Sequence, residues 1–243
     1  MAGGPPSAAA GASATGAVTA PGDRTSGGID GVTAVVPVKP LALAKSRLAL
    51  PVELRAALAL AFVLDTVAAL VDSPRVRAIV VVTADRGVER ALRDLPVHLL
   101  GDPGGGLLGA VTAGCRFADG RRPGAGLAVV PADLPCLSAA DVTQVLRLAQ
   151  GTDGAYVEDS ASTGTTFLVS PSGRRWAPQY GPGSADRHRA QGLACLEDAP
   201  PGARLDVDTL ADLQAAERLG LGAWTAAQVT ALGDLGPAAS LTA

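Results

Sequence analysis

Aromatic side chains are scarce in this 243-residue chain, at 3% of all residues. Its core must therefore be built mainly from Val, Leu, Ala and Ile, in a sequence that is 48% hydrophobic. That mixture is typical of parallel strands covered by helices on both faces. The length fits one α/β domain with a sizeable core.

Cysteine is also rare, and the three present, Cys115, Cys136 and Cys195, lie far apart without metal-ligand spacing. An odd count of this kind predicts reduced thiols and a cytoplasmic protein. The first residues lack the charged start and Leu-rich stretch of a signal peptide. No uninterrupted apolar run is long enough to predict a membrane span. A net charge of -3 disfavours nucleic-acid binding, which usually needs a basic face.

Composition divides the chain into three parts. Residues 1–30 are almost entirely Ala, Gly, Pro, Ser and Thr, too poor in bulky apolar groups to offset the entropy lost on ordering. We expect a disordered tail there, a domain over residues 31–222, and a C-terminal extension or tail over residues 223–243, tail-like from about residue 233.

Strand and helix patterns alternate along the domain, which predicts right-handed crossovers and a mostly parallel sheet. The expected fold is Rossmann-like, with helices on both faces of the sheet. Ligands of such sheets bind outside the carboxyl ends of the strands. The predicted strands are 32–38, 78–83, 97–100, 127–131, 154–158 and 165–170, and the predicted helices are 51–71, 85–94, 108–117, 138–150 and a last one beginning near Thr209.

Basic side chains follow the first predicted strand. The chain has twenty Lys and Arg residues, yet its only two lysines, Lys39 and Lys45, lie in this loop together with Arg47. A lysine supplies a compact, mobile charge suited to phosphate oxygens. We therefore expect the loop to bind a triphosphate, the alternative being a solvated loop. It lacks the Gly-x-x-x-x-Gly-Lys-Ser/Thr spacing of a P-loop.

Carboxylates follow the strand 127–131 and recur near residue 207. Asp133, in Ala-Asp-Leu-Pro, lies where a carboxylate can hold Mg²⁺ against nucleotide phosphates; it could instead cap the next turn. Asp206 and Asp208 would share one face of a strand. We expect Asp206 to complete the Mg²⁺ site, because Asp208 precedes a helix whose N-terminus it could serve.

Glycine and hydroxyl side chains mark three further segments. Glycines over residues 101–106 allow a backbone to pass close to a base or ribose. Residues 162–166 are rich in Ser and Thr, and the stretch 180–189 begins Tyr-Gly-Pro-Gly-Ser before a predicted helix, where backbone N–H groups favour anions. His188, at the end of that stretch, is expected at the surface.

These segments together resemble a known family. The order Val-Lys-(x)₅-Lys-Ser-Arg-Leu, Asp-Leu-Pro, Gly-Thr, Tyr-Gly-Pro-Gly-Ser-(x)₃-His-Arg and Asp-Val-Asp-Thr is similar to the 2-phospho-L-lactate or phosphoenolpyruvate guanylyltransferases of coenzyme F-420 biosynthesis, over residues 32–222. The chain departs from the pattern at Leu108-Gly109, where relatives often have Leu-Asn.

The resemblance implies a glycosyltransferase-A-type nucleotidyltransferase that joins GTP to a small phosphorylated carboxylic acid. It implies that Thr165, Gly181 and Ser184 contact phosphoenolpyruvate. The metal ligands would be Asp133 and Asp206.

Two other functions fit the same motifs. One is another small-molecule nucleotidyltransferase, of the molybdopterin or sugar-phosphate type. The other is a nucleotide-binding module without catalysis. We expect no nucleic-acid or membrane partner, and a homodimer would be ordinary for such an enzyme.

Overall fold

A computed structural model describes residues 31–171 and 176–234. The predicted N-terminal tail, residues 1–30, and most of the predicted C-terminal tail lie outside the described residues. The elements, apart from three short 3₁₀ turns, are β1 (Val32–Val38), α1 (Val52–Asp72), β2 (Val76–Thr83), α2 (Arg86–Leu92), β3 (His98–Gly101), α3 (Gly106–Arg121), β4 (Gly126–Val129), α4 (Ala139–Leu148), β5 (Ala155–Glu158), β6 (Thr165–Ser170), α5 (Ser184–Ala190), β7 (Ala194–Cys195), α6 (Leu210–Leu219) and α7 (Ala223–Asp234).

One sheet runs through the described residues in the order β3-β2-β1-β4-β6-β5-β7. The pairs β1–β2, β1–β4, β2–β3 and β5–β7 are parallel, whereas β6 is antiparallel to both β4 and β5. The predicted mostly parallel sheet is therefore confirmed. Because β6 runs the other way, its first residue lies at the edge where β4 ends, with Leu168 opposite Val129.

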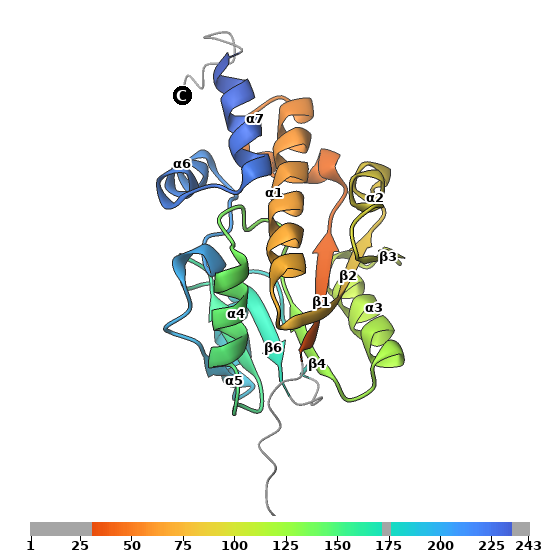
Figure 1. Cartoon of the computed structure of the whole chain (residues 1–243). Helices are drawn as coiled ribbons and strands as arrows, with labels where there is room; N and C mark the ends of the chain where they lie inside the picture. The colour runs from red at the N-terminus through yellow and green to blue at the C-terminus, as the bar shows by residue number, and fades with distance from the viewer. Residues whose placement is uncertain (1–30, 172–175, 235–243) are drawn as a thin grey trace, which may run out of the picture.

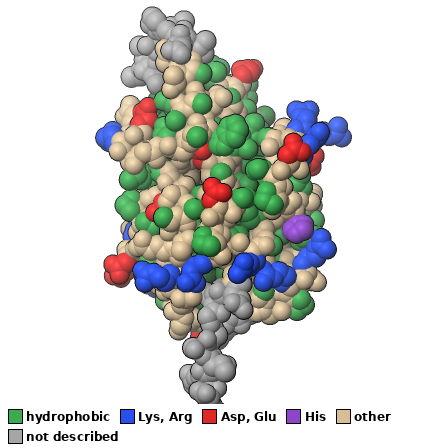
Figure 2. All heavy atoms as spheres, viewed as in Figure 1, with side chains coloured by type: hydrophobic (Ala, Val, Ile, Leu, Met, Phe, Trp, Pro, Cys, Tyr) green, Lys and Arg blue, Asp and Glu red, His purple; other side chains and the backbone are tan. Residues whose placement is uncertain are grey.

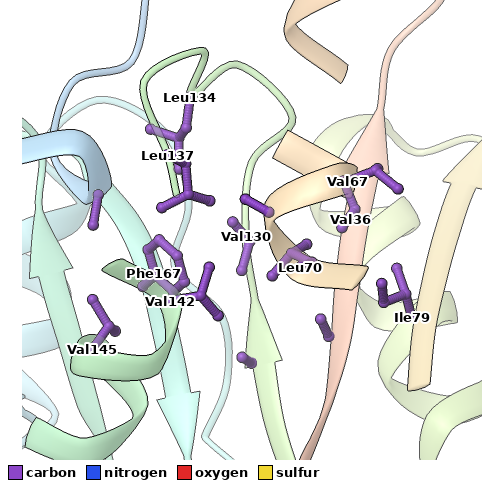
Figure 3. Packing of buried hydrophobic residues seen from close by; sticks show 14 of the residues in the cluster. Val36, Val67, Leu70, Ile79, Val130, Leu134, Leu137, Val142, Val145 and Phe167 are labelled. Atoms are coloured by element: carbon purple, nitrogen blue, oxygen red, sulfur yellow. The ribbon is translucent and has the colours of Figure 1, made fainter. Parts of the chain in front are cut away.

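Helices cover both faces of this sheet, as the fold prediction required (Figure 1). One face packs on α1, α2 and α4, and its buried side chains include Val36, Leu70, Val142 and Phe167 (Figure 3). The other face packs on α3 and α5. Helix α3 lies so close to β1 that a Cβ on Gly114 would come within 2.4 Å of Val35 Cγ1.

Helix α1 is the longest helix described, and its length and hydropathy would also suit a membrane span. Most of that apolar surface is buried inside the domain, where Leu58, Phe62 and Val67 are fully enclosed. The apolar character of α1 is therefore explained by its position in the core.

Figure 2 shows Lys and Arg side chains in a band at the end of the molecule where β1 begins, away from the carboxyl ends of the parallel strands.

The last two helices form a separate small core with α1. The Thr209 hydroxyl and the Asp212 carboxylate make a capping box at the start of α6, so the helix predicted near Thr209 is confirmed. It is not the last helix, however, because α7 follows and packs on α1 (Figure 1). Both carboxylate oxygens of Asp65, on α1, accept N–H groups from Trp224 and Thr225 at 3.1 and 2.8 Å. The cap of α7 thus comes from another helix, which the local sequence cannot reveal.

Candidate active site

The lysine loop leaves β1 at the carboxyl edge of the sheet and turns sharply. Its fold is fixed by Asp85, whose carboxylate accepts the Leu41 N–H at 2.8 Å while also capping α2. Lys45 has a left-handed backbone with φ of 54°, a conformation that few non-glycine residues adopt. This turn places the Lys45 side chain against carboxylates from two distant parts of the chain.

Lys45 Nζ lies 2.5 Å from Asp133 Oδ2 and 2.8 Å from Asp208 Oδ1. Its side chain is only 7% exposed, whereas that of Arg47, which lies 3.6 Å from Asp208, is 75% exposed. Lys39 is also exposed and lines the same cleft. The structure thus brings all three predicted cations to one cleft, with Lys45 in contact with acidic side chains.

Charge and burial compete at this cluster. Burial alone would lower the pKa of the Lys45 ammonium, but the Asp133 and Asp208 carboxylates outweigh it and hold that pKa above its usual value. Burial acts to raise the pKa of Asp208, yet Lys45, and to a smaller degree Arg47 and Lys39, bring it below its usual value. Both partners of the Lys45–Asp208 pair are therefore charged at neutral pH.

Asp206 lies beside Asp133, since the N–H of the next residue, Val207, donates to the Asp133 carbonyl at 3.1 Å. Burial, followed by the charges of Asp133, Asp159 and Asp208, raises the pKa of Asp206 to about 7. Asp133 Oδ1 is buried without a hydrogen-bond partner. A buried carboxylate oxygen without a partner, next to the Asp206 carboxylate with other acidic groups around it, is a suitable place for a divalent cation.

Asp133 and Asp206 would give a metal ion only two protein side chains as ligands. Within residues 31–171 and 176–234, no three His, Cys, Asp or Glu side chains are arranged as a metal site. Mg²⁺ commonly takes one or two carboxylates and completes its shell with water and substrate phosphates. Asp133 and Asp206 fit that mode of binding.

A cleft of about 290 Å³ opens beside the lysine loop, Asp133 and Asp208. Leu107, at the start of α3, closes one side, and Phe62 and Val63 of α1 line another. The glycine-rich segment before α3 folds back on itself: a Cβ on Gly109 would lie 2.1 Å from the Gly104 carbonyl oxygen. The glycine at the position where the chain departs from the family pattern is thus required by the local packing.

The segments around Thr165, Gly181 and Ser184 meet at the start of β6. Ser184 Oγ donates to Thr165 Oγ1 at 3.2 Å, and the Ser184 N–H donates to the Gly181 carbonyl at 3.0 Å. Gly181 has φ of 119°, which favours glycine. The preceding loop is held by Asp159, whose carboxylate accepts the N–H groups of Thr163 and Gly164. Because Asp159 also raises the pKa of Asp206, the two groups of predicted site residues adjoin.

Two residues differ from the sequence interpretation. Asp208 does not serve the α6 N-terminus through its carboxylate, which pairs with Lys45 and Arg47, while Thr209 and Asp212 cap the helix. His188, expected at the surface, is fully buried. The Asp-Val-Asp alternation, which puts Asp206 and Asp208 on one face, is a sequence signal that Asp208 could belong to the site. No local sequence signal indicates the burial of His188.

Comparison with known proteins agrees with this geometry. Residues 51–199 match the model of the MobA-like NTP transferase domain. A protein named phosphoenolpyruvate guanylyltransferase from Streptomyces scabiei is 44% identical over 208 residues, which cover 82% of this chain and 96% of that protein. One of the same name from Streptomyces coelicolor is 44% identical, covering 80% and 94%. The chain belongs to the phosphoenolpyruvate guanylyltransferase family. As a member of that family it is a nucleotidyltransferase.

Solved structures support the fold of this guanylyltransferase family member. A protein assigned as a nucleotide-diphospho-sugar transferase from Desulfovibrio desulfuricans G20 superposes with a TM-score of 0.62 at 18% identity, covering 84% of this chain and 96% of that one. A 4-diphosphocytidyl-2C-methyl-D-erythritol synthase gives 0.55 at 14% identity, covering 78% and 99%. The expected glycosyltransferase-A-type nucleotidyltransferase fold is therefore confirmed.

Proposed function

We propose that this protein transfers the guanylyl group of GTP to phosphoenolpyruvate, giving enolpyruvyl-diphospho-5'-guanosine and pyrophosphate for coenzyme F-420 biosynthesis. The observation that carries the proposal is the convergence of the lysine loop with Asp133 and Asp208 in one cleft at the carboxyl edge of the sheet. The names of the relatives supply the substrates.

The proposed reaction is an in-line displacement. A phosphate oxygen of phosphoenolpyruvate attacks the α-phosphorus of GTP, and the bond from that phosphorus to the bridging oxygen of the β-phosphate breaks. Pyrophosphate leaves with the electron pair of that bond. The attacking phosphate is already an anion, so no protein base is needed.

The main obstacle to the reaction is repulsion between the anionic phosphates of GTP and of phosphoenolpyruvate. The side chains at this site would reduce that repulsion. Lys39, Lys45 and Arg47 would bind phosphate oxygens and stabilise the charge that grows on pyrophosphate. Asp133 and Asp206 would hold a divalent cation, Mg²⁺ in our proposal, which supplies charge neutralisation between the phosphates when bound. The elements that carry these residues would hold the two substrates in line for the displacement.

The acceptor would lie against Thr165, Gly181 and Ser184. Thr165 and Ser184 supply hydroxyl groups, and Gly181 lets the backbone approach a ligand without a side chain between them. Thr165→Val and Ser184→Ala should mainly raise the KM for the phospho-acid. A change confined to the KM for GTP would mean that this pocket is assigned to the wrong substrate.

Pyrophosphate release tests the reaction directly. The purified chain is supplied with GTP, Mg²⁺ and, in turn, phosphoenolpyruvate, 2-phospho-L-lactate and 3-phosphoglycerate. We expect release with phosphoenolpyruvate, and release with another acid alone would reassign the acceptor. Silence with all three, but turnover of ATP or CTP with a sugar phosphate or a molybdopterin, would replace the proposed function with a related transferase.

A pair of variants links the activity to the site. Asp133→Asn should lower turnover by at least about a hundredfold, because it removes a charge from the proposed metal site. Asp72→Asn, at the exposed end of α1, is the matched control and should retain wild-type turnover. Near-normal turnover in Asp133→Asn would exclude Asp133 from the mechanism.

A further inference from the structure

His188 is a buried, uncharged histidine that the proposed chemistry does not use. It lies on α5 with no exposed surface, between the rings of Tyr156 and Tyr180, whose centroids are 5.9 and 5.7 Å from its own. Burial, reinforced by the charge of Arg187, lowers the pKa of His188 to about 4. The imidazole is therefore neutral at physiological pH, and only one ring nitrogen carries a proton.

The backbone decides which nitrogen that is. The Gln179 N–H lies 3.0 Å from His188 Nε2, and a backbone N–H can only donate. Nε2 must then accept, so the proton is on Nδ1. Gln179 is itself held in place, because the Arg187 guanidinium donates to its carbonyl at 2.9 and 3.2 Å.

The Nδ1 proton points at the hydroxyl of Thr165. Nδ1 lies 2.9 Å from Thr165 Oγ1, and Ser184 Oγ donates to the same oxygen at 3.2 Å. A hydroxyl oxygen has two lone pairs, so these two donors occupy both of them. The Thr165 proton is then left to donate, and among the hydrogen bonds of the described residues the Thr165 hydroxyl donates to no protein acceptor when Nδ1 carries the imidazole proton.

We propose that His188 is a positioning residue that makes the Thr165 hydroxyl an obligate hydrogen-bond donor to the acidic group of the phospho-acid. The inference rests on the proposed function and on Thr165 contacting that substrate. Phosphate and carboxylate oxygens accept hydrogen bonds, so a hydroxyl whose proton is free is complementary to them. An unrestrained hydroxyl could instead turn its proton toward a neighbouring protein group, leaving a lone pair to repel the anion.

The hydrogen bonds in this chain all donate in one direction, toward the ligand. It runs from the Gln179 amide through the imidazole and the Thr165 hydroxyl to the ligand, and each donor polarises the next. A side chain of the same size without nitrogen would leave Thr165 in place but release its proton. His188 therefore affects binding of the phospho-acid, and its replacement should leave the KM for GTP nearly unchanged.

Steady-state kinetics of His188→Phe and His188→Asn test this role. We expect His188→Phe to raise the KM for phosphoenolpyruvate about tenfold or more, with the kcat and the KM for GTP changed less than about threefold. His188→Asn retains an N–H near the position of Nδ1 and should recover most of the loss. His98→Phe, at the other histidine of the chain, is the matched control and should behave as wild type. Equal KM values in His188→Phe and wild type, or equal loss in both His188 variants, would overturn the proposal.

A measurement on the wild-type protein is independent of folding in the variants. Long-range ¹H–¹⁵N spectra distinguish the two neutral tautomers of an imidazole. We expect His188 to show the Nδ1–H form, without titration, from about pH 5.5 to 8. An Nε2–H form or an imidazolium at pH 7 would overturn the proposal, whether or not the proposed function holds. If the tautomer is as expected but no phospho-acid is turned over, the failure belongs to the proposed function.

Discussion

Lys45 contacts Asp133, one of the two carboxylates of the proposed cation site, and Asp208 beside it, so its removal should change both stability and metal binding. The ammonium is 2.5 Å from Asp133 and 2.8 Å from Asp208. Removing one partner of a buried ion pair typically costs about 3–5 kcal/mol. Asp133 and Asp208 keep 26% and 46% of their side-chain surface exposed, so water recovers part of that cost. We expect Lys45→Ala to lower the free energy of unfolding by about 2 kcal/mol without metal.

Magnesium should then restore what the substitution removes. A ligand present at about a hundred times its Kd stabilises the native state by about 2.7 kcal/mol. In the wild type the Lys45 ammonium already neutralises part of the charge around Asp133, whereas in Lys45→Ala a cation would meet carboxylates without that compensation. We therefore expect Mg²⁺ to raise the urea midpoint of Lys45→Ala more than that of the wild type.

The assay is urea unfolding with Mg²⁺ or with EDTA. Lys39→Ala is the matched control, since Lys39 is on the same loop but exposed. It should lose less than about 0.5 kcal/mol. The reasoning is refuted if Mg²⁺ stabilises the wild type and Lys45→Ala equally, because the Lys45 charge would then have no effect on binding of the cation.

Three further outcomes follow from the structure. Asp65→Ala should lower the free energy of unfolding by about 2–3 kcal/mol and speed amide exchange in α7, because two N–H groups lose a charged acceptor. The folded His188 titrates near pH 4 and an unfolded histidine near 6.5, so the unfolded state binds more protons between them. The free energy of unfolding should then fall by up to about 3 kcal/mol as the pH drops through that window, measured by urea titration. Gly109→Ala should raise the KM for GTP and destabilise the protein by about 1–3 kcal/mol, since its Cβ would meet the Gly104 carbonyl at 2.1 Å.

Each outcome has a control within the chain. Asp72→Ala, on the same helix as Asp65 but exposed, should be neutral. His188→Asn should flatten the loss of stability between pH 6.5 and 4 relative to wild type. Gly120→Ala, on the same helix as Gly109 but with open space around it, should be neutral or stabilising. Equal stability losses for Asp65→Ala and Asp72→Ala, or for Gly109→Ala and Gly120→Ala, would contradict the corresponding argument, as would the same pH dependence in His188→Asn and wild type.

The sequence predicts the parts of this fold that depend on local chemistry. The strand Val32–Val38 and the strand Thr165–Ser170 were located to the residue, because apolar β-rich runs ended at clear turn signals. The helix start at Thr209 follows from its capping chemistry. Helix α7 was missed because its cap comes from Asp65, about 160 residues away in the chain.

The same distinction holds at the candidate site. Asp133 and the lysine loop could be placed together because parallel strands end at one edge of a sheet. The contact between Lys45 and Asp208 spans 163 positions and depends on the left-handed turn at Lys45, so composition and spacing give no sign of it. The burial of His188 depends likewise on Tyr156 and Gln179, which belong to other segments.

The site is therefore assembled by contacts that do not involve the proposed substrates. Asp85 holds the lysine loop through Leu41, and Asp159 holds the loop before Thr165. The Val207 N–H bond to Asp133 brings Asp206 to the same edge. These three hydrogen-bonded contacts hold the segments together, so the carboxylates stay close despite their mutual repulsion. It is offset by a charge held between them: the Lys45 ammonium in the structure described, and a cation with nucleotide phosphates in the proposed reaction.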